Sequence, residues 1–194
     1  MPVTDPLAHL ARATTALVLV DLQEKLLPAV VDSERVTRAT RLLLRAAHVL
    51  KLPVIATTQY RKGLGEVVAP VEELIPMDAA RLDKTAFSCF DDARFDDVLR
   101  RAAPGAATLL VAGIETHICV AGTVLGALRR GYGVEIVTDA VSSRATSDHE
   151  VGLKRMERAG TLPTTAEMAI YELLGGSSSA EFKALLPYFK EASA

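Results

Sequence analysis

The stretch TLLVAGIETHICVAG, residues 108–122, places an apolar run directly before a turn of small residues. Its first part, Thr108–Ala112, is a short run of the kind that forms buried strands. Cys119 follows where the spacing predicts the start of a helix, and Gly131 is the residue type at which helices commonly end. A buried strand that turns directly into a helix is the repeating unit of α/β proteins. This stretch therefore predicts one strand–helix unit of a parallel sheet.

Three further apolar runs share this character, and longer segments with helical periodicity lie between the runs. The three runs are Ala16–Val20, Pro53–Thr57 and Val134–Thr138. In Glu34–Leu50 apolar residues recur every three or four positions, as one buried face of a helix requires. Because the predicted strands are continuously apolar, we expect a sheet that is covered on both faces. The sequence thus predicts a doubly wound α/β protein in which residues 1–194 form a single domain.

Helix starts are marked in the second half of the chain. Three segments carry a hydroxyl residue followed three positions later by a carboxylate, which is the spacing of a capping box. They are Ser147–Glu150, Thr164–Glu167 and Ser178–Glu181. We expect a helix to begin at each of them.

The composition excludes several classes of partner. A formal net charge of −2 gives no attraction to nucleic acid or to anionic membranes. No apolar run approaches the ~20 residues that span a bilayer, and the first residues lack the pattern of a signal peptide. Cys89 and Cys119 are too few for a disulfide framework. We therefore expect a cytoplasmic protein that binds neither nucleic acid nor membranes.

Charged residues near the predicted strands are candidates for a site, because ligands of doubly wound sheets bind beyond the carboxyl ends of the strands. Asp21 directly follows Ala16–Val20, so its carboxylate is either a cap at the rim of the sheet or a base in the crevice. Lys84 lies in RLDKTAFSCF, residues 81–90, where a solvated surface charge is the simpler interpretation. Beside a thiol, such a carboxylate could remove the proton while the ammonium group holds developing negative charge.

Cys119 has two interpretations that these patterns leave open. In the first turn of a helix, the helix dipole and unpaired N–H groups favour the thiolate, and low-pKa cysteines cluster at such positions. Alternatively, the side chain is a small hydrophobe that closes the helix onto the sheet. Cys89, between Ser88 and Phe90, has no activating context, and we interpret it as a packing residue.

The sequence resembles the isochorismatase-like cysteine hydrolase superfamily, and within it the isochorismatase domain-containing proteins. Three motifs carry the match in the same order and spacing: LVLVDLQEKLLP with Asp21, LDKTAFS with Lys84, and VAGIETHICVAGTVLGALRRGYGVEIVTDAVSSR with Cys119. The resemblance covers about residues 17–174 and implies a three-layer fold with a six-stranded parallel sheet. It also implies a cofactor-free Cys-Asp-Lys triad in which Asp21 is the base, Lys84 the electrostatic partner and Cys119 the nucleophile.

The resemblance further implies a cis peptide bond between Ile114 and Glu115, which would turn the backbone N–H groups of Glu115 and Cys119 towards an oxyanion. The nicotinamidase branch of the superfamily carries an Asp-x-His metal motif after its second strand, where this chain reads TTQYRKGLG, residues 57–65. We therefore expect neither a metal site nor nicotinamidase activity. Four residues are candidates for lining a substrate pocket, with a structural role as the alternative: Gln59, Tyr60, Phe87 and Thr116.

These features lead to one hypothesis about function and two alternatives. The leading hypothesis is a hydrolase that cleaves a small amide or related C–N bond through a thioester on Cys119. The first alternative is hydrolysis of the vinyl ether of an isochorismate-like small molecule, which proceeds by protonation and does not require the thiol. The second is a non-catalytic binding or scaffolding protein.

Two further expectations concern the surface. The resemblance implies a homo-oligomer. A basic stripe runs along the first long predicted helix, and it is either a solvated face or a surface for an acidic partner or another subunit. The stripe consists of Arg35, Arg38, Arg41 and Arg45.

Overall fold

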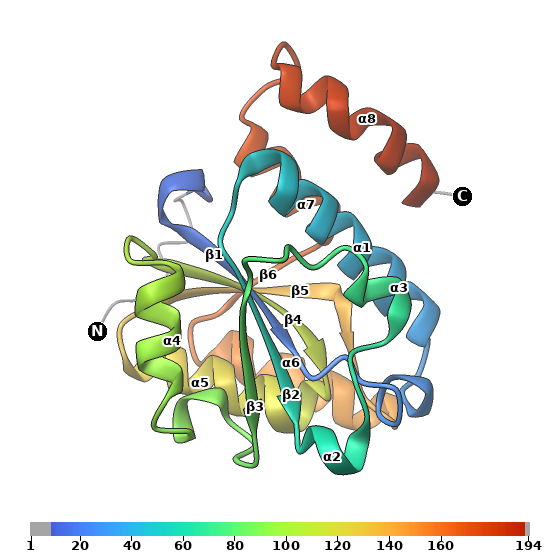
Figure 1. The fold of residues 1–194 in the computed structure, drawn as a ribbon, viewed down its shortest axis with the longest axis vertical. Coiled ribbons are helices and arrows are strands. Elements are labelled where there is room, and N and C mark those ends of the chain that lie inside the picture. Colours follow the sequence, from blue (N-terminus) through green and yellow to red (C-terminus); the bar gives the residue numbers. More distant parts are fainter. Residues whose placement is uncertain (1–8, 193–194) are drawn as a thin grey trace.

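The computed structural model describes residues 9–192 and shows six parallel strands in one sheet with helices on both faces (Figure 1). The strand order is β3-β2-β1-β4-β5-β6. The strands are β1 (Thr15–Val20), β2 (Val54–Gln59), β3 (Ala80–Lys84), β4 (Thr108–Ile114), β5 (Gly133–Ser142) and β6 (Leu162–Thr164). The predicted fold class, a three-layer doubly wound α/β fold with a six-stranded sheet, is confirmed.

The helices form a layer on each face of the sheet (Figure 1). One face is covered by α1 (Ser33–Leu50) and α7 (Ala166–Leu174), with α8 (Ala180–Ala192) packed on α1. The opposite face is covered by α4 (Phe95–Ala102), α5 (Ala121–Arg129) and α6 (Thr146–Arg158). The short helices α2 (Arg61–Leu64) and α3 (Ala69–Glu72) lie between β2 and β3. In the described part of the chain, no helix has the length and apolar character needed to cross a membrane.

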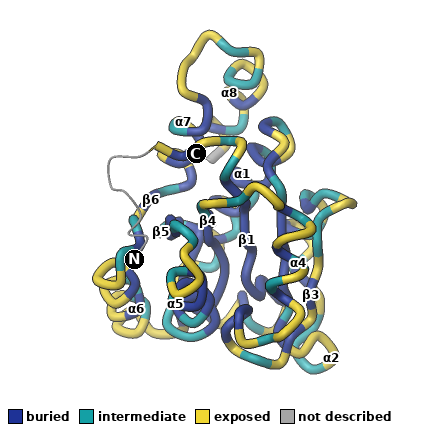
Figure 2. Tube along the Cα trace, turned by 90° about the vertical axis from the view of Figure 1, so that its left-hand side faces the viewer, coloured by how far each residue is buried: buried dark blue, intermediate teal, exposed yellow. Residues whose placement is uncertain are grey.

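Burial explains which elements the sequence pattern reveals. All six residues of β1 are buried, and Figure 2 shows β1 and β4 as dark, buried segments inside the molecule. The predicted apolar face of α1 is also buried. By contrast, β3 lies at the edge of the sheet with Arg81 and Asp83 exposed, and β6 contains only three residues around Pro163. The apolar runs therefore indicate four strands, whereas β3 and β6 carry no such signal.

The predicted helix starts need correction by one or more residues. Thr165 caps α7, because its side chain accepts a hydrogen bond from the backbone N–H of Met168 at 3.2 Å. Ser179 likewise accepts from the N–H of Phe182 at 3.1 Å, at the start of α8. Residue 145, an alanine, precedes α6 and offers no side-chain cap. Hydroxyl residues are adjacent to each predicted cap, so the spacing locates the helices but not their first residues.

The topological switch point of the sheet lies between β1 and β4. From β1 the chain proceeds to β2 and β3 on one side, and it then returns to β4, β5 and β6 on the other. Gly113, near the end of β4, pairs with Val20 and has a φ of +124°. A Cβ atom at this position would lie 2.0 Å from the carbonyl oxygen of Val20. Glycine is thus required where β4 passes the end of β1, at the edge where ligands of such sheets bind.

We predict that Gly113→Ala lowers the free energy of unfolding by at least about 2 kcal/mol, because the backbone of Val20 cannot move aside cheaply. Gly160 is a matched control, since its φ is also positive (+104°) but a Cβ atom added there would have no neighbouring atom within 4 Å. Gly160→Ala should therefore cost only the backbone strain, about 1 kcal/mol. Urea unfolding of both variants measures the difference. Equal losses would show that the contact with Val20 is unimportant.

Candidate active site

Three elements bring the predicted triad residues together. Asp21 follows β1 with a φ of 54°, Lys84 is the last residue of β3, and Cys119 lies in the turn Thr116–Val120 between β4 and α5. Lys84 Nζ lies 2.7 Å from Asp21 Oδ2, and the Cys119 thiol forms a hydrogen bond with the Asp21 side chain. The side chains of Asp21 and Lys84 are 0% exposed and Cys119 is 6% exposed. The interpretation of Lys84 as a solvated surface charge is therefore wrong.

The buried ion pair is surrounded by further hydrogen-bond partners. Asp21 Oδ1 accepts a hydrogen bond from Thr57 Oγ1 at 2.7 Å. Lys84 Nζ donates a second bond to Gln59 Oε1, also at 2.7 Å. Removing two charges from water is costly, and their mutual attraction compensates only where the remaining polar atoms are also paired. The neighbours of Asp21 and Lys84 meet that requirement.

The Cys119 thiol is protonated at neutral pH in this arrangement. Burial raises the pKa of the thiol far above its ordinary value, the negative charge of Asp21 raises it further, and Lys84 lowers it only in part. Of the two interpretations of Cys119, the one in which the start of a helix favours the thiolate is wrong in direction, because burial outweighs the helix dipole. A nucleophilic role for Cys119 consequently needs a base, and Asp21 already accepts a hydrogen bond from the thiol.

The second cysteine is nearer to this cluster than the sequence suggests. Cys89 is completely buried, as expected of a packing residue, but its thiol also donates to Thr57 Oγ1 at 3.9 Å. Burial raises the pKa of Cys89 to about 11, and the positive charge of Lys84 lowers it only in part. Cys89 is therefore a neutral donor to Thr57, which in turn donates to Asp21.

Hydrogen bonds of Glu115 fix the turn that carries Cys119. The peptide bond between Ile114 and Glu115 is cis, at the position that the resemblance implies. The Glu115 carboxylate accepts hydrogen bonds from the backbone N–H of Arg144 at 3.0 Å and from its guanidinium group at 3.0 and 3.1 Å. The Glu115 carbonyl oxygen accepts from the N–H groups of Ile118 and Val120. These bonds place Cys119 at a defined point beside Asp21.

The four candidates for lining a pocket have different environments. Gln59 is buried and contacts the triad through Lys84. Thr116 is completely buried, and its hydroxyl lies 2.9 Å from His149 Nδ1. Tyr60 and Phe87 are 53% and 64% exposed, respectively, and both are close in sequence to residues of the cluster. Direct contact with a substrate stays a prediction for all four.

The sequence patterns did not single out two residues that support the cluster. Thr57 binds Asp21, and Gln23 binds Gln59 in two ways: Gln23 Oε1 accepts from the Gln59 N–H at 2.6 Å, and Gln23 Nε2 donates to the Gln59 carbonyl at 3.1 Å. Thr57 and Gln59 are two positions apart on β2, so their side chains share one face of the strand. The spacing of two positions indicates that the side chains of Thr57 and Gln59 share a face, but the strand order is also needed to predict that this face contacts Asp21 and Lys84.

No group of three or more histidine, cysteine, aspartate or glutamate side chains within residues 9–192 could hold a metal ion. The place where the resemblance would put a metal motif is occupied by Gln59, whose amide oxygen binds Lys84. The donor set expected for such a metal therefore does not fit this part of the chain.

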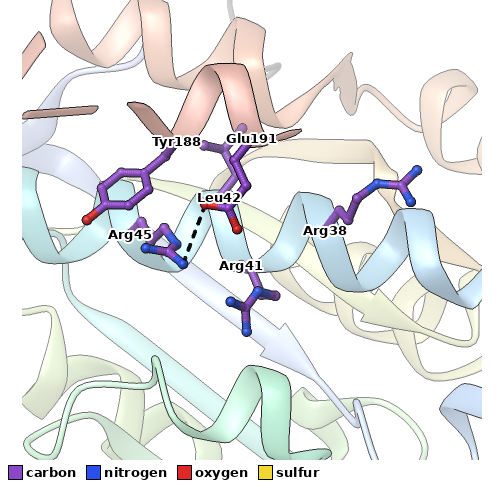
Figure 3. A pocket seen from close by; sticks show the side chains of 6 residues that line it. All are labelled: Arg38, Arg41, Leu42, Arg45, Tyr188 and Glu191. Atoms are coloured by element: carbon purple, nitrogen blue, oxygen red, sulfur yellow. Dashed lines mark ion pairs between the residues drawn. The ribbon is translucent and has the colours of Figure 1, made fainter. Parts of the chain in front are cut away.

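The predicted basic stripe is divided between two environments. Arg35 is held by Asp32 and by the carbonyl oxygens of Thr138 and Val141, so it ties α1 to β5. The other arginines border a groove between α1 and α8 (Figure 3), which is lined by Arg38, Arg41, Leu42, Arg45, Tyr188 and Glu191.

This groove is remote from the triad. The Arg45 guanidinium group lies 4.1 Å from the centroid of the Tyr188 ring and 3.8 Å from the Glu191 carboxylate. Figure 3 shows the guanidinium groups of Arg38, Arg41 and Arg45 pointing in different directions, so they do not converge on one ligand. The helix α1 also packs on the face of the sheet opposite to the one that buries Cys119. The groove is therefore not the candidate active site.

A buried cysteine, carboxylate and ammonium group at the switch point of a doubly wound sheet is the arrangement that the resemblance to isochorismatase-like hydrolases implies. The comparison of sequences agrees: residues 15–168 match the family model described as the Isochorismatase domain. Isochorismatase domain-containing protein 1 from Salmo salar is 34% identical over 183 residues, covering 91% of this chain and 61% of the length of that protein. The chain belongs to the isochorismatase family.

Solved structures show the same fold. A structure of MAR1 ribonuclease from Caenorhabditis elegans superposes with a TM-score of 0.88 at 36% identity, covering 94% of this chain and 93% of that chain. YcaC from Pseudomonas aeruginosa, with hexane-2,5-diol and covalent acrylamide, gives 0.87 at 25% identity, covering 96% and 95%. The ycaC gene product from Escherichia coli, described as an octameric hydrolase of unknown specificity, gives 0.85 at 26%, covering 98% and 97%.

We predict that Lys84→Met lowers the free energy of unfolding by about 3–5 kcal/mol, because it leaves the Asp21 charge buried without its partner. The double variant Asp21→Asn/Lys84→Met should lose less than the sum of the two single variants, since it removes both charges. Urea unfolding of the four proteins gives this coupling. A loss below about 1 kcal/mol for Lys84→Met would mean that the pair is effectively solvated.

We also predict that Asp21→Asn lowers the apparent pKa of the Cys119 thiol by about one unit or more, because it removes a negative charge that raises this pKa. The rate of modification by acrylamide as a function of pH, with the two cysteine peptides resolved by mass spectrometry, reports this value. Asp83→Asn is the matched control, since Asp83 is an exposed carboxylate next to Lys84 in sequence. An unchanged or raised value in Asp21→Asn would contradict the assigned contact.

Proposed function

We propose that this protein is a cofactor-free cysteine hydrolase that cleaves a small amide or related C–N bond. The observation that carries the proposal is the position of the Asp21 carboxylate, which contacts the Cys119 thiol and the Lys84 ammonium group at once. A protonated thiol beside an ionised base is a nucleophile ready for activation. Lys84 compensates the charge of the buried Asp21 carboxylate before the reaction begins.

The first half of the reaction transfers the acyl group to the protein. Asp21 takes the thiol proton as the Cys119 sulfur attacks the substrate carbonyl carbon, which becomes tetrahedral and carries an oxyanion. When the carbonyl re-forms, the C–N bond breaks, and the leaving nitrogen receives the proton from Asp21. The products of this half are ammonia or an amine and a thioester on Cys119.

The second half releases the acid. Asp21, again ionised, takes a proton from a water molecule, and the resulting hydroxide attacks the thioester carbonyl. The bond between sulfur and carbon breaks, and the thiolate recovers the proton from Asp21. In both halves we assign the backbone N–H groups of Glu115 and Cys119 to the oxyanion, and the hydrogen bonds that hold this turn would keep them oriented before the reaction.

The charges around the site favour a small neutral substrate. Asp21 is paired with Lys84, and Glu115 with Arg144 at 3.0 Å, so neither charged pair offers an unmatched partner to an ionic ligand. Cys119 is 6% exposed, which leaves access only to a small reacting group.

The working form of the protein is proposed to be a homo-oligomer in the cytoplasm. The octameric relative from Escherichia coli supports the assembly. Both cysteines are free and buried, which suits a reducing compartment.

We predict that Cys119→Ala lowers the hydrolysis of small amides by about a thousandfold or more, with an unchanged melting temperature within a few degrees. Turnover of a panel of neutral primary amides, followed by ammonia release, measures the loss. Undiminished amide hydrolysis in Cys119→Ala would exclude the mechanism. Retained cleavage of an isochorismate-like vinyl ether in the same variant would instead support the protonation route, and complete inactivity of the wild type would favour a binding protein.

A further inference from the structure

We propose that β2 positions the charged residues of the active site. Thr57 holds Asp21 and Gln59 holds Lys84, and both act as positioning residues. The inference rests on the proposed function and gives both residues a role that acts through Asp21 and Lys84. In the sheet β2 lies between β1, which carries Asp21 at its end, and β3, which ends at Lys84. β2 is therefore adjacent to both strands that supply the members of the ion pair.

The register of the strands places each partner opposite its target. The backbone N–H of Asp21 donates to the Thr57 carbonyl at 3.2 Å, and Gln59 is paired with Lys84 in the ladder between β2 and β3. Side chains at positions i and i+2 of a strand point to the same face. Thr57 and Gln59 thus present their polar atoms on one face of β2, where Thr57 contacts Asp21 and Gln59 contacts Lys84.

Thr57 has one hydroxyl hydrogen, and its surroundings direct that hydrogen to Asp21. The Cys89 thiol donates to Thr57 Oγ1 at 3.9 Å and thereby occupies an acceptor position of the hydroxyl. The hydroxyl hydrogen then goes to Asp21 Oδ1 at 2.7 Å rather than to the Leu19 carbonyl at 3.5 Å. With Oδ1 held by Thr57 and Oδ2 by Lys84, rotation of the Asp21 carboxylate is blocked, and its position relative to Cys119 is set.

Gln59 orients Lys84 in a corresponding way. Its Nε2 donates to the Thr85 carbonyl at 2.7 Å, so its Oε1 must face the Lys84 ammonium group. The backbone of Gln59 forms two hydrogen bonds with the side chain of Gln23, which is completely buried. A neutral amide is the suitable partner here, because a second carboxylate beside Lys84 would compete with Asp21 and add negative charge near the thiol.

The test uses isosteric variants and the pH dependence of Cys119 modification by acrylamide. Thr57→Val removes the donor to Asp21 and leaves its charge less compensated, and Gln59→Glu adds a carboxylate beside Lys84. Both variants should move the profile of Cys119 to higher pH by about one unit and slow modification at pH 8 about tenfold. Thr57→Ser keeps the hydroxyl and should behave as the wild type. Thr58→Val is the matched control, because Thr58 is the next residue of β2 and binds the exposed Asp83 instead.

The pH profile of Cys119 modification distinguishes a positioning role of Thr57 and Gln59 from a purely structural role. A loosened core would expose Cys119 and relieve the burial that raises its pKa, so modification would become faster and the profile would move to lower pH. That result in Thr57→Val and Gln59→Glu would overturn the inference. An unmoved profile with an unchanged rate would overturn it as well. If Thr57→Val does not fold, Gln59→Glu carries the same test on the lysine side. Loss of the proposed function is detected separately, by amide turnover that survives in Cys119→Ala.

Discussion

The structure of the site depends on one buried ion pair, the contact of 2.7 Å between Asp21 and Lys84. Neither side chain reaches solvent, so each charge is tolerable only because the other is present and because Thr57 and Gln59 satisfy the remaining polar atoms. The same pair influences the thiol: burial and then the Asp21 charge raise the pKa of Cys119, while Lys84 lowers it in part. In the proposed mechanism, the Cys119 thiol stays protonated until Asp21 removes its proton.

The sheet makes this arrangement possible by bringing three distant segments to one edge. Asp21 follows β1 and Cys119 follows β4, the two strands that flank the topological switch point, and Lys84 reaches the same edge from β3 across β2. Gly113 allows β4 to pass the end of β1 closely enough for the following turn to reach the carboxylate. The site is thus a consequence of strand order, and the helices serve mainly to exclude water from both faces of the sheet.

The sequence predicted the parts of this structure that depend on local pattern. The buried strands β1 and β4 are continuous apolar runs, so Asp21 and Cys119 stood out at their ends, and the resemblance supplied the pairing with Lys84. Lys84 itself gave no local signal, because β3 is an edge strand with alternating charged residues. Thr57 and Gln59 were unpredictable as supports, since their partners depend on register between strands. Of the two interpretations of Cys119, the one based on the helix dipole gives the wrong direction for the pKa, because it leaves out burial.

The central claim is that the Cys119 sulfur becomes acylated during turnover with Asp21 as the base. Rapid acid quenching of the protein during reaction with neutral primary amides, followed by mass spectrometry of the two cysteine peptides, tests it most directly. The account predicts an added mass equal to the acyl group on the peptide of Cys119, no such mass on that of Cys89, and none on either in Asp21→Asn. Hydrolysis of an amide with no acylated Cys119 at any quench time, and at an equal rate in Cys119→Ala, would contradict it.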